Sequence, residues 1–120
     1  MSLRFLVAVF CLSTFFFFDQ AEADEQYTIW GNGNQSCGSW TATHNDNTDG
    51  SAIEEASQEA WVEGFITAFS AFGFTPSRTF TLDYAALKAW IDNYCSAHPL
   101  DSISKASEVL AVQLQLRVSK

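Results

Sequence analysis

The residues that could carry catalytic chemistry are few in this chain. It has two histidines, His44 and His98, and three cysteines. Neither histidine accompanies a nucleophile motif such as Gly-x-Ser-x-Gly, which a hydrolase of that type needs beside its base. Acidic residues are plentiful, but no spacing singles out the pair of carboxylates that a glycosidase uses. These patterns predict a protein that is not an enzyme and that uses no cofactor.

The patterns that predict metal sites are incomplete. Cys37 and Cys95 lack the Cys-x-x-Cys spacing of a zinc site. The segment 45–56 begins like a calcium-binding EF-hand loop, but Ala56 stands where that loop needs a bidentate glutamate. We therefore interpret this segment as a polar turn and predict no metal ligands.

The charge balance excludes two classes of partner. The 120 residues include 6 Lys and Arg against 14 Asp and Glu, for a net charge of −8. A nucleic-acid-binding protein needs a basic surface to neutralise phosphates, and a membrane-surface protein needs a polybasic segment. Neither is present, and the length is that of one small domain.

The first residues have the pattern of an export signal. Arg4 precedes an apolar run over 5–18, and Ala21-Glu22-Ala23 supplies small residues at a cleavage site. We expect a signal peptide over 1–23 that is removed after Ala23, which gives a periplasmic or secreted protein without a membrane anchor. An uncleaved anchor is the alternative.

Two cysteines remain after this cleavage, Cys37 and Cys95. An even pair in an exported chain predicts a disulfide. Such a bridge closes a loop of roughly sixty residues and would stabilise the fold by roughly 4 kcal/mol. Two free thiols and an intermolecular bridge stay open as alternatives.

The elements that must position these residues are helices. We predict one domain over 24–120, with a polar N-terminal arm over 24–50 that holds a short helix or extended piece. A helical core follows over 51–120. The predicted fold class is all-α, a small single-domain bundle of three to four short helices with one disulfide.

Three helices follow from apolar spacing of three and four residues. The first covers about 52–72 and begins at a Ser51–Glu54 capping box. We expect its Gly64 to allow another element to approach closely. The second helix covers about 82–97, and the third begins with Asp101 as its N-cap.

Three segments carry a resemblance to a known family. They are 36–40 (SCGSW), 61–65 (WVEGF) and 90–99 (WIDNYCSAHP). This layout resembles the HdeA/HdeB family of small periplasmic acid-stress proteins. The resemblance implies an all-α fold, a disulfide between Cys37 and Cys95, and an acid-activated chaperone. Apolar surface would then bind unfolded client proteins at low pH, with the candidate residues Trp61, Phe65, Phe69 and Trp90.

Acidic residues are the candidates for pH sensing or for partner binding. Carboxylates lose their charge near pH 4, so acid would weaken their contacts and loosen the packing or a dimer. The candidates in the segment 44–55, which we expect to be a surface loop, are Asp46, Asp49, Glu54 and Glu55. We allow for a homodimer on the same grounds.

Other segments of the chain are similar to a second family of proteins. Gly64-Phe65-Ile66 and His98-Pro99, followed by a final helix over 103–114, are similar to segments of periplasmic immunity proteins that block type VI secretion amidase toxins. This resemblance implies an inhibitor whose acidic loop meets a cationic toxin or enzyme.

Overall fold

The computed structural model describes residues 27–73 and 82–118, and all regular structure there is helical. A short 3-10 helix, η1 (Gly31–Asn34), precedes α2 (Cys37–Asn45), α3 (Asp49–Phe72), α4 (Tyr84–Ala97) and α5 (Ile103–Val118). The predicted all-α class is confirmed. The predicted signal peptide over 1–23 lies outside the described residues.

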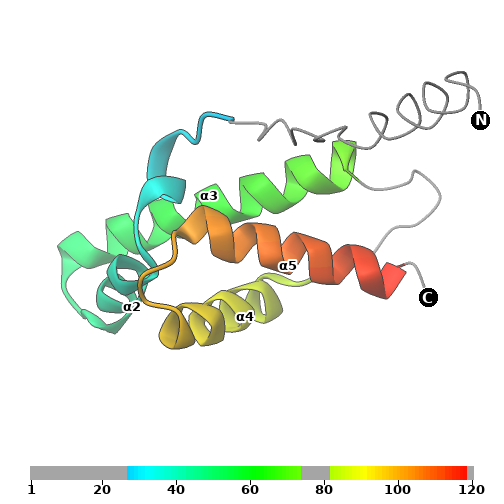
Figure 1. Cartoon of the computed structure of the whole chain (residues 1–120). Helices are drawn as coiled ribbons and strands as arrows, with labels where there is room; N and C mark the ends of the chain where they lie inside the picture. Colours follow the sequence, from blue (N-terminus) through cyan, green and yellow to red (C-terminus); the bar gives the residue numbers. More distant parts are fainter. Residues whose placement is uncertain (1–26, 74–81, 119–120) are drawn as a thin grey trace, which may run out of the picture.

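The helices form one bundle (Figure 1). Helices α3 and α5 run side by side in the same direction, and α4 returns antiparallel to both. The short α2 lies at the end where α3 begins and α4 ends, in contact with both. None of the helices in the described ranges has the length and apolarity needed to cross a lipid bilayer.

Helix α2 belongs to the core, although its sequence places it in the predicted polar arm. Ser36 caps it by accepting a hydrogen bond from the Ser39 amide at 3.1 Å. Cys37 and Trp40 lie one turn apart on its buried face and are fully buried. The core also takes residues from the other three α-helices: Val62, Ile66, Leu87, Ile91, Cys95, Ile103, Ala106, Leu110, Ala111 and Leu114.

The helix starts differ from those predicted. Thr48 caps α3, so this helix begins one turn before the predicted Ser51–Glu54 capping box. Ser102 Oγ accepts from the Lys105 amide at 3.1 Å and caps α5, whereas Asp101 was the predicted cap. In both helices the N-cap is a hydroxyl side chain. Its oxygen accepts from the amide three residues later, which has no partner within the helix.

A disulfide joins α2 to α4. Cys37 and Cys95 are bonded, with their Cα atoms 4.6 Å apart, which confirms the pairing predicted from the two cysteines. Both side chains are fully buried in the core. The alternatives of free thiols and of an intermolecular bridge are therefore not what the structure adopts.

Backbone hydrogen bonds surround this disulfide. The Cys37 amide donates to the Asp101 carbonyl at 2.7 Å, and the Gly38 amide donates to the Pro99 carbonyl at 2.9 Å. In return, the Ile103 amide donates to the Gln35 carbonyl at 2.9 Å. The first amides of α2 and α5, which have no partner within their own helices, are thus paired across the junction.

Two glycines have opposite environments. A Cβ atom on Gly33 would lie 2.2 Å from Cζ2 of Trp61, because the indole ring packs against the backbone of η1. Trp61 Nε1 also donates to the Trp30 carbonyl at 2.6 Å, which fixes the ring. By contrast, a Cβ on Gly64 would meet nothing within 4 Å, so the predicted close approach at Gly64 is wrong. The apolar spacing of α3 could not reveal which glycine faces a neighbour.

Replacing Gly33 with alanine should displace Trp61 and lower the free energy of unfolding by about 1–3 kcal/mol, the usual cost of overpacking. Urea unfolding followed by circular dichroism measures this difference. The matched control is Gly64→Ala, which should raise stability by about 0.5–1 kcal/mol because alanine favours an exposed helical position. A Gly33→Ala variant as stable as the wild type would contradict the packing described above.

Candidate functional site

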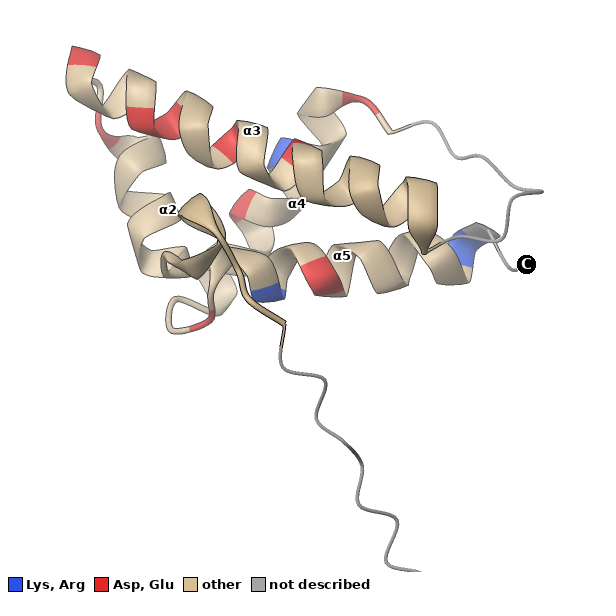
Figure 2. Cartoon of the chain, turned by 90° about the horizontal axis from the view of Figure 1, so that it is seen from above, with Lys and Arg blue, Asp and Glu red and all other residues tan. Residues whose placement is uncertain are grey.

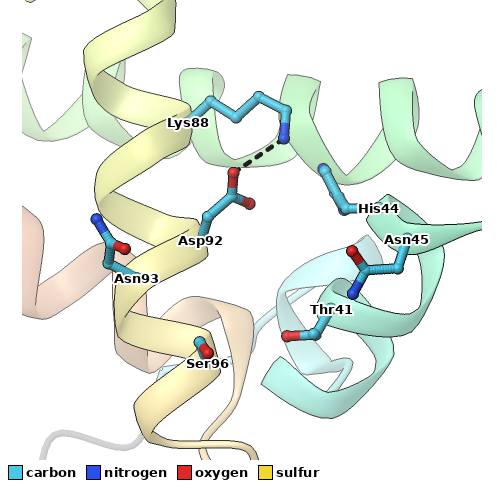
Figure 3. A pocket seen from close by; sticks show the side chains of 7 residues that line it. All are labelled: Thr41, His44, Asn45, Lys88, Asp92, Asn93 and Ser96. Atoms are coloured by element: carbon cyan, nitrogen blue, oxygen red, sulfur yellow. Dashed lines mark hydrogen bonds and ion pairs between the residues drawn. The ribbon is translucent and has the colours of Figure 1, made fainter.

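A polar pocket of about 300 Å³ opens between α2 and α4 (Figure 3). The fully buried Trp40, one turn along α2 from the disulfide, contacts two of the residues that line it, His44 and Asp92. Polar side chains from both helices surround the opening: Thr41, His44, Asn45, Lys88, Asp92, Asn93 and Ser96.

Asp92 connects the buried indole to the surface. Its Oδ1 atom accepts a hydrogen bond from Trp40 Nε1 at 2.7 Å, and its Oδ2 atom lies 3.0 Å from Lys88 Nζ one turn earlier on α4. A buried N–H left without an acceptor costs about 1–3 kcal/mol, and an ionised acceptor makes the stronger bond. The charge of Asp92 therefore stabilises the contact between α2 and α4.

His44 lies against the face of the Trp40 indole. Its ring stacks on the indole with centroids 4.0 Å apart, and its Nδ1 atom lies 2.8 Å from the Trp40 carbonyl oxygen. Because a carbonyl oxygen only accepts, Nδ1 carries the hydrogen and donates. The Nε2 atom points to α3, where it lies 3.3 Å from Oε1 of Glu59 and 3.7 Å from Oε1 of Glu55.

The three groups that meet at this point include the donor types that metal ions use. One ligand atom from each of His44, Glu55 and Glu59 lies within 4.8 Å of the others. Their side chains are 6%, 31% and 14% exposed, respectively, so the cluster is largely shielded from solvent. Imidazole and carboxylate together can hold a divalent cation.

Lys88 and Tyr84 border this cluster from α4. Lys88 Nζ lies 3.9 Å from Oε1 of Glu55, in addition to its contact with Asp92. Burial, a hydrogen bond with Glu59 and the negative charges of nearby glutamates raise the pKa of the Tyr84 phenol. The hydroxyl therefore stays protonated and neutral beside the carboxylates.

The four predicted acidic residues do not form one site. Asp46 and Asp49 are exposed, and Asp46 accepts from the Thr48 hydroxyl at 3.2 Å. Glu54 accepts from Gln35 Nε2 at 2.6 Å, and Glu55 faces His44. The prediction of a surface loop over 44–55 is wrong, because α2 extends to Asn45 and α3 begins at Asp49. Figure 2 shows acidic residues spaced along the α3 ribbon rather than gathered in one loop.

The four predicted apolar residues lie on two parts of the core surface. Trp61, Phe65 and Phe69 stack in a row along α3, with successive ring centroids 5.5 and 6.5 Å apart. Trp90 stacks on Tyr94 of α4 and donates from Nε1 to Gln113 Oε1 at 3.1 Å. All four are half-buried against the core.

Sequence reasoning missed Glu59, Lys88 and Asp92. The signal that could have indicated them is the spacing of four residues in Glu55–Glu59 and in Lys88–Asp92, which places each pair on one helix face. That spacing alone does not show which helices meet, and the pocket depends on the position of α2.

Comparisons with known proteins give no relatives for this chain. No family model matches it, and neither a curated protein nor a solved structure does.

A further carboxylate contact closes the turn between α4 and α5. The Tyr94 hydroxyl donates to Oδ2 of Asp101 at 2.6 Å. This hydrogen bond, with burial and the charge of Asp101, raises the pKa of Tyr94 to about 12. Because the folded pKa is raised, the stability that the neutral phenol contributes is complete below pH 10. It is lost as the pH rises from about 10 to about 12.

Substituting Asp101→Asn should lower the Tyr94 pKa toward 10, because the amide lacks the charge that opposes phenolate formation. Absorbance at 295 nm during an alkaline titration follows the three tyrosines of the chain. The transition near pH 12 should move to lower pH in Asp101→Asn and be lost in Tyr94→Phe, which assigns it, while Tyr84, whose pKa is also raised, still titrates late in both variants. An unchanged titration in Asp101→Asn would show that this contact does not control Tyr94.

Proposed function

We propose that this chain is a small exported protein without enzymatic activity that binds unfolded client proteins in acid, as members of the HdeA/HdeB family do. The observation that carries the proposal is the hydrogen bond from the buried Trp40 indole to the Asp92 carboxylate. It makes a core contact depend on a group that acid neutralises.

Further contacts between elements depend on carboxylates. Glu54 accepts from Gln35 and joins α3 to the segment before α2, while Asp101 accepts from Tyr94 and joins the α5 side of the turn to α4. A protonated carboxyl is a weaker acceptor than a carboxylate. Acid also changes the charge of the whole chain from −8 at pH 7 to positive, because only Lys, Arg and His remain charged.

Glu108 changes the pH dependence of stability in the opposite direction from these carboxylates. Burial raises the pKa of its carboxyl group, so the folded chain holds this proton more tightly than the unfolded chain does. The stability from this group is complete in acid and is lost as the pH rises through its folded pKa. The proposal therefore requires the loss of the other carboxylate contacts to outweigh the gain at Glu108.

Loosened packing would release apolar surface where it is already partly accessible. Trp61, Phe65, Phe69 and Trp90 are half-buried against the core, so helices that separate would expose more of their rings. The Cys37–Cys95 bond would hold α2 to α4 in this state, and the chain could close again when the pH returns to neutral.

The proposal predicts an acid transition that changes apolar exposure, mass or shape, and activity toward a client protein. The oxidised protein, titrated from pH 7 to pH 2, should bind an apolar dye below about pH 4 while circular dichroism still reports helix. Sedimentation over the same range reports a change in mass or shape. In that acidic range the protein should also keep an acid-sensitive enzyme soluble.

The variant Asp92→Asn tests whether the acid transition depends on the Asp92 carboxylate, which accepts from the Trp40 indole. It should lower the free energy of unfolding at pH 7 by about 1 kcal/mol and shift dye binding to higher pH. At pH 2 it should match the wild type, because a protonated carboxyl resembles the amide. The matched control is Asp49→Asn, the same charge change at an exposed position in the first turn of α3, which should shift the midpoint less than Asp92→Asn does. A protein that stays compact and binds no dye down to pH 2 would refute the proposal.

A second candidate function, an inhibitor or immunity protein for a cationic toxin or enzyme, is favoured by the corner between α2 and α3. Ile53 is 76% exposed there, and Asp46 and Asp49, earlier in the same segment, are also exposed. An apolar side chain among acidic ones suits a basic protein surface.

This candidate predicts a stoichiometric basic partner at neutral pH. A pull-down from periplasm should recover it at low salt, and Ile53→Ser should lose it because the apolar contact is removed. Val112→Ser, which changes a half-exposed apolar residue on α5, is the control and should retain it. Recovery of no such partner would count against an inhibitor.

A further inference from the structure

In the neutral His44 ring the Nε2 atom carries no hydrogen, yet it faces two carboxylates. Its Nδ1 atom holds the single hydrogen, which it donates to the Trp40 carbonyl at 2.8 Å. The Nε2 lone pair is then directed at Oε1 of Glu59, 3.3 Å away, and lies 3.7 Å from Oε1 of Glu55. A lone pair facing carboxylate oxygens at these distances is repulsive unless a proton or a metal cation lies between them.

The spacing of these donors fits a metal ion. Nitrogen and oxygen ligands of tetrahedral zinc lie about 2.0–2.2 Å from the ion, so neighbouring ligand atoms are about 3.3 Å apart. The separations from Nε2 are 3.3 and 3.7 Å, and the three ligand atoms all lie within 4.8 Å of one another. Closing this geometry would require the two glutamate side chains to rotate toward the ion.

The surroundings of His44 are those of a metal ligand. Metal-binding histidines commonly donate their second ring N–H to a backbone carbonyl, which fixes the tautomer and the ring direction. Here the Trp40 carbonyl accepts that hydrogen, and the Trp40 ring stacks on the imidazole. Glu55 and Glu59 lie one turn apart on α3, so both carboxylates reach the same side of His44.

We propose that His44, Glu55 and Glu59 bind one divalent first-row transition metal ion, with zinc as the best match. One nitrogen and two oxygen donors suit this class better than calcium or magnesium, which prefer oxygen ligands alone. A water molecule completes the four ligands. Glu55, the most exposed of the three at 31%, marks the side open to solvent.

Lys88 competes with the metal for Glu55, but it has another partner. Its Nζ atom lies 3.9 Å from Glu55 and only 3.0 Å from Asp92. The ammonium group can therefore remain with Asp92 when Glu55 turns to the metal. Bound metal would join α2 to α3, as the disulfide joins α2 to α4.

The test is a calorimetric titration of the oxidised, metal-stripped full chain with zinc chloride at pH 7. We expect one ion per chain and a melting temperature that rises by about 5 °C or more in excess zinc. His44→Gln and Glu59→Gln should each weaken binding at least about tenfold. The matched control is His98→Gln, which removes the other, exposed histidine and should bind zinc like the wild type.

Cobalt supplies a readout that does not depend on the folding of any variant. Cobalt(II) bound to the wild-type chain should show the visible absorption of a four-coordinate nitrogen and oxygen site, and zinc should abolish it. Absence of one-site binding in the wild type would overturn the proposal. Equal binding by His44→Gln, or equal loss in His98→Gln, would also overturn it.

Discussion

The rest of the structure depends on the junction where Cys37 is bonded to Cys95. This bond holds the first turn of α2 against the last turn of α4, with Cα atoms 4.6 Å apart. Around it, the amides of Cys37 and Gly38 are paired with carbonyls of the α4–α5 turn, and the Ile103 amide is paired with the Gln35 carbonyl. A chain of this size has a small core, so its folded structure depends strongly on this junction. There the disulfide constrains the chain, and the hydrogen bonds beside it pair the first amides of α2 and α5.

Trp40 connects this junction to the polar residues Asp92 and His44. It is fully buried one turn after Cys37, yet its Nε1 atom binds the Asp92 carboxylate and its carbonyl binds His44. Through these bonds, one core residue positions the carboxylate proposed to respond to acid and the imidazole proposed to bind metal. Both proposals therefore rest on the same physical arrangement, although each depends on different titratable or coordinating groups.

Sequence patterns predicted the parts of the fold that depend on local periodicity. The apolar spacing of α3, α4 and α5 and the pairing of two cysteines were sufficient for the fold class and the disulfide. Helix α2 was ambiguous because its glycine and threonines favour no helix, and it forms through the Ser36 cap and the burial of Cys37 and Trp40. The site was missed for the same reason: His44 meets Glu59 only because α2 packs on α3, a contact between segments that no local pattern encodes.

Hydrogen exchange measured by mass spectrometry on the oxidised chain at pH 7 and pH 3, corrected for the intrinsic exchange rates, tests the central claim most directly. If carboxylate contacts maintain the bundle around a covalent junction, amides of α3 should lose protection in acid. The amides of Cys37, Gly38 and Ile103 beside the disulfide should retain it. Equal protection of α3 at both pH values, or earlier loss at the junction than in α3, would contradict the claim.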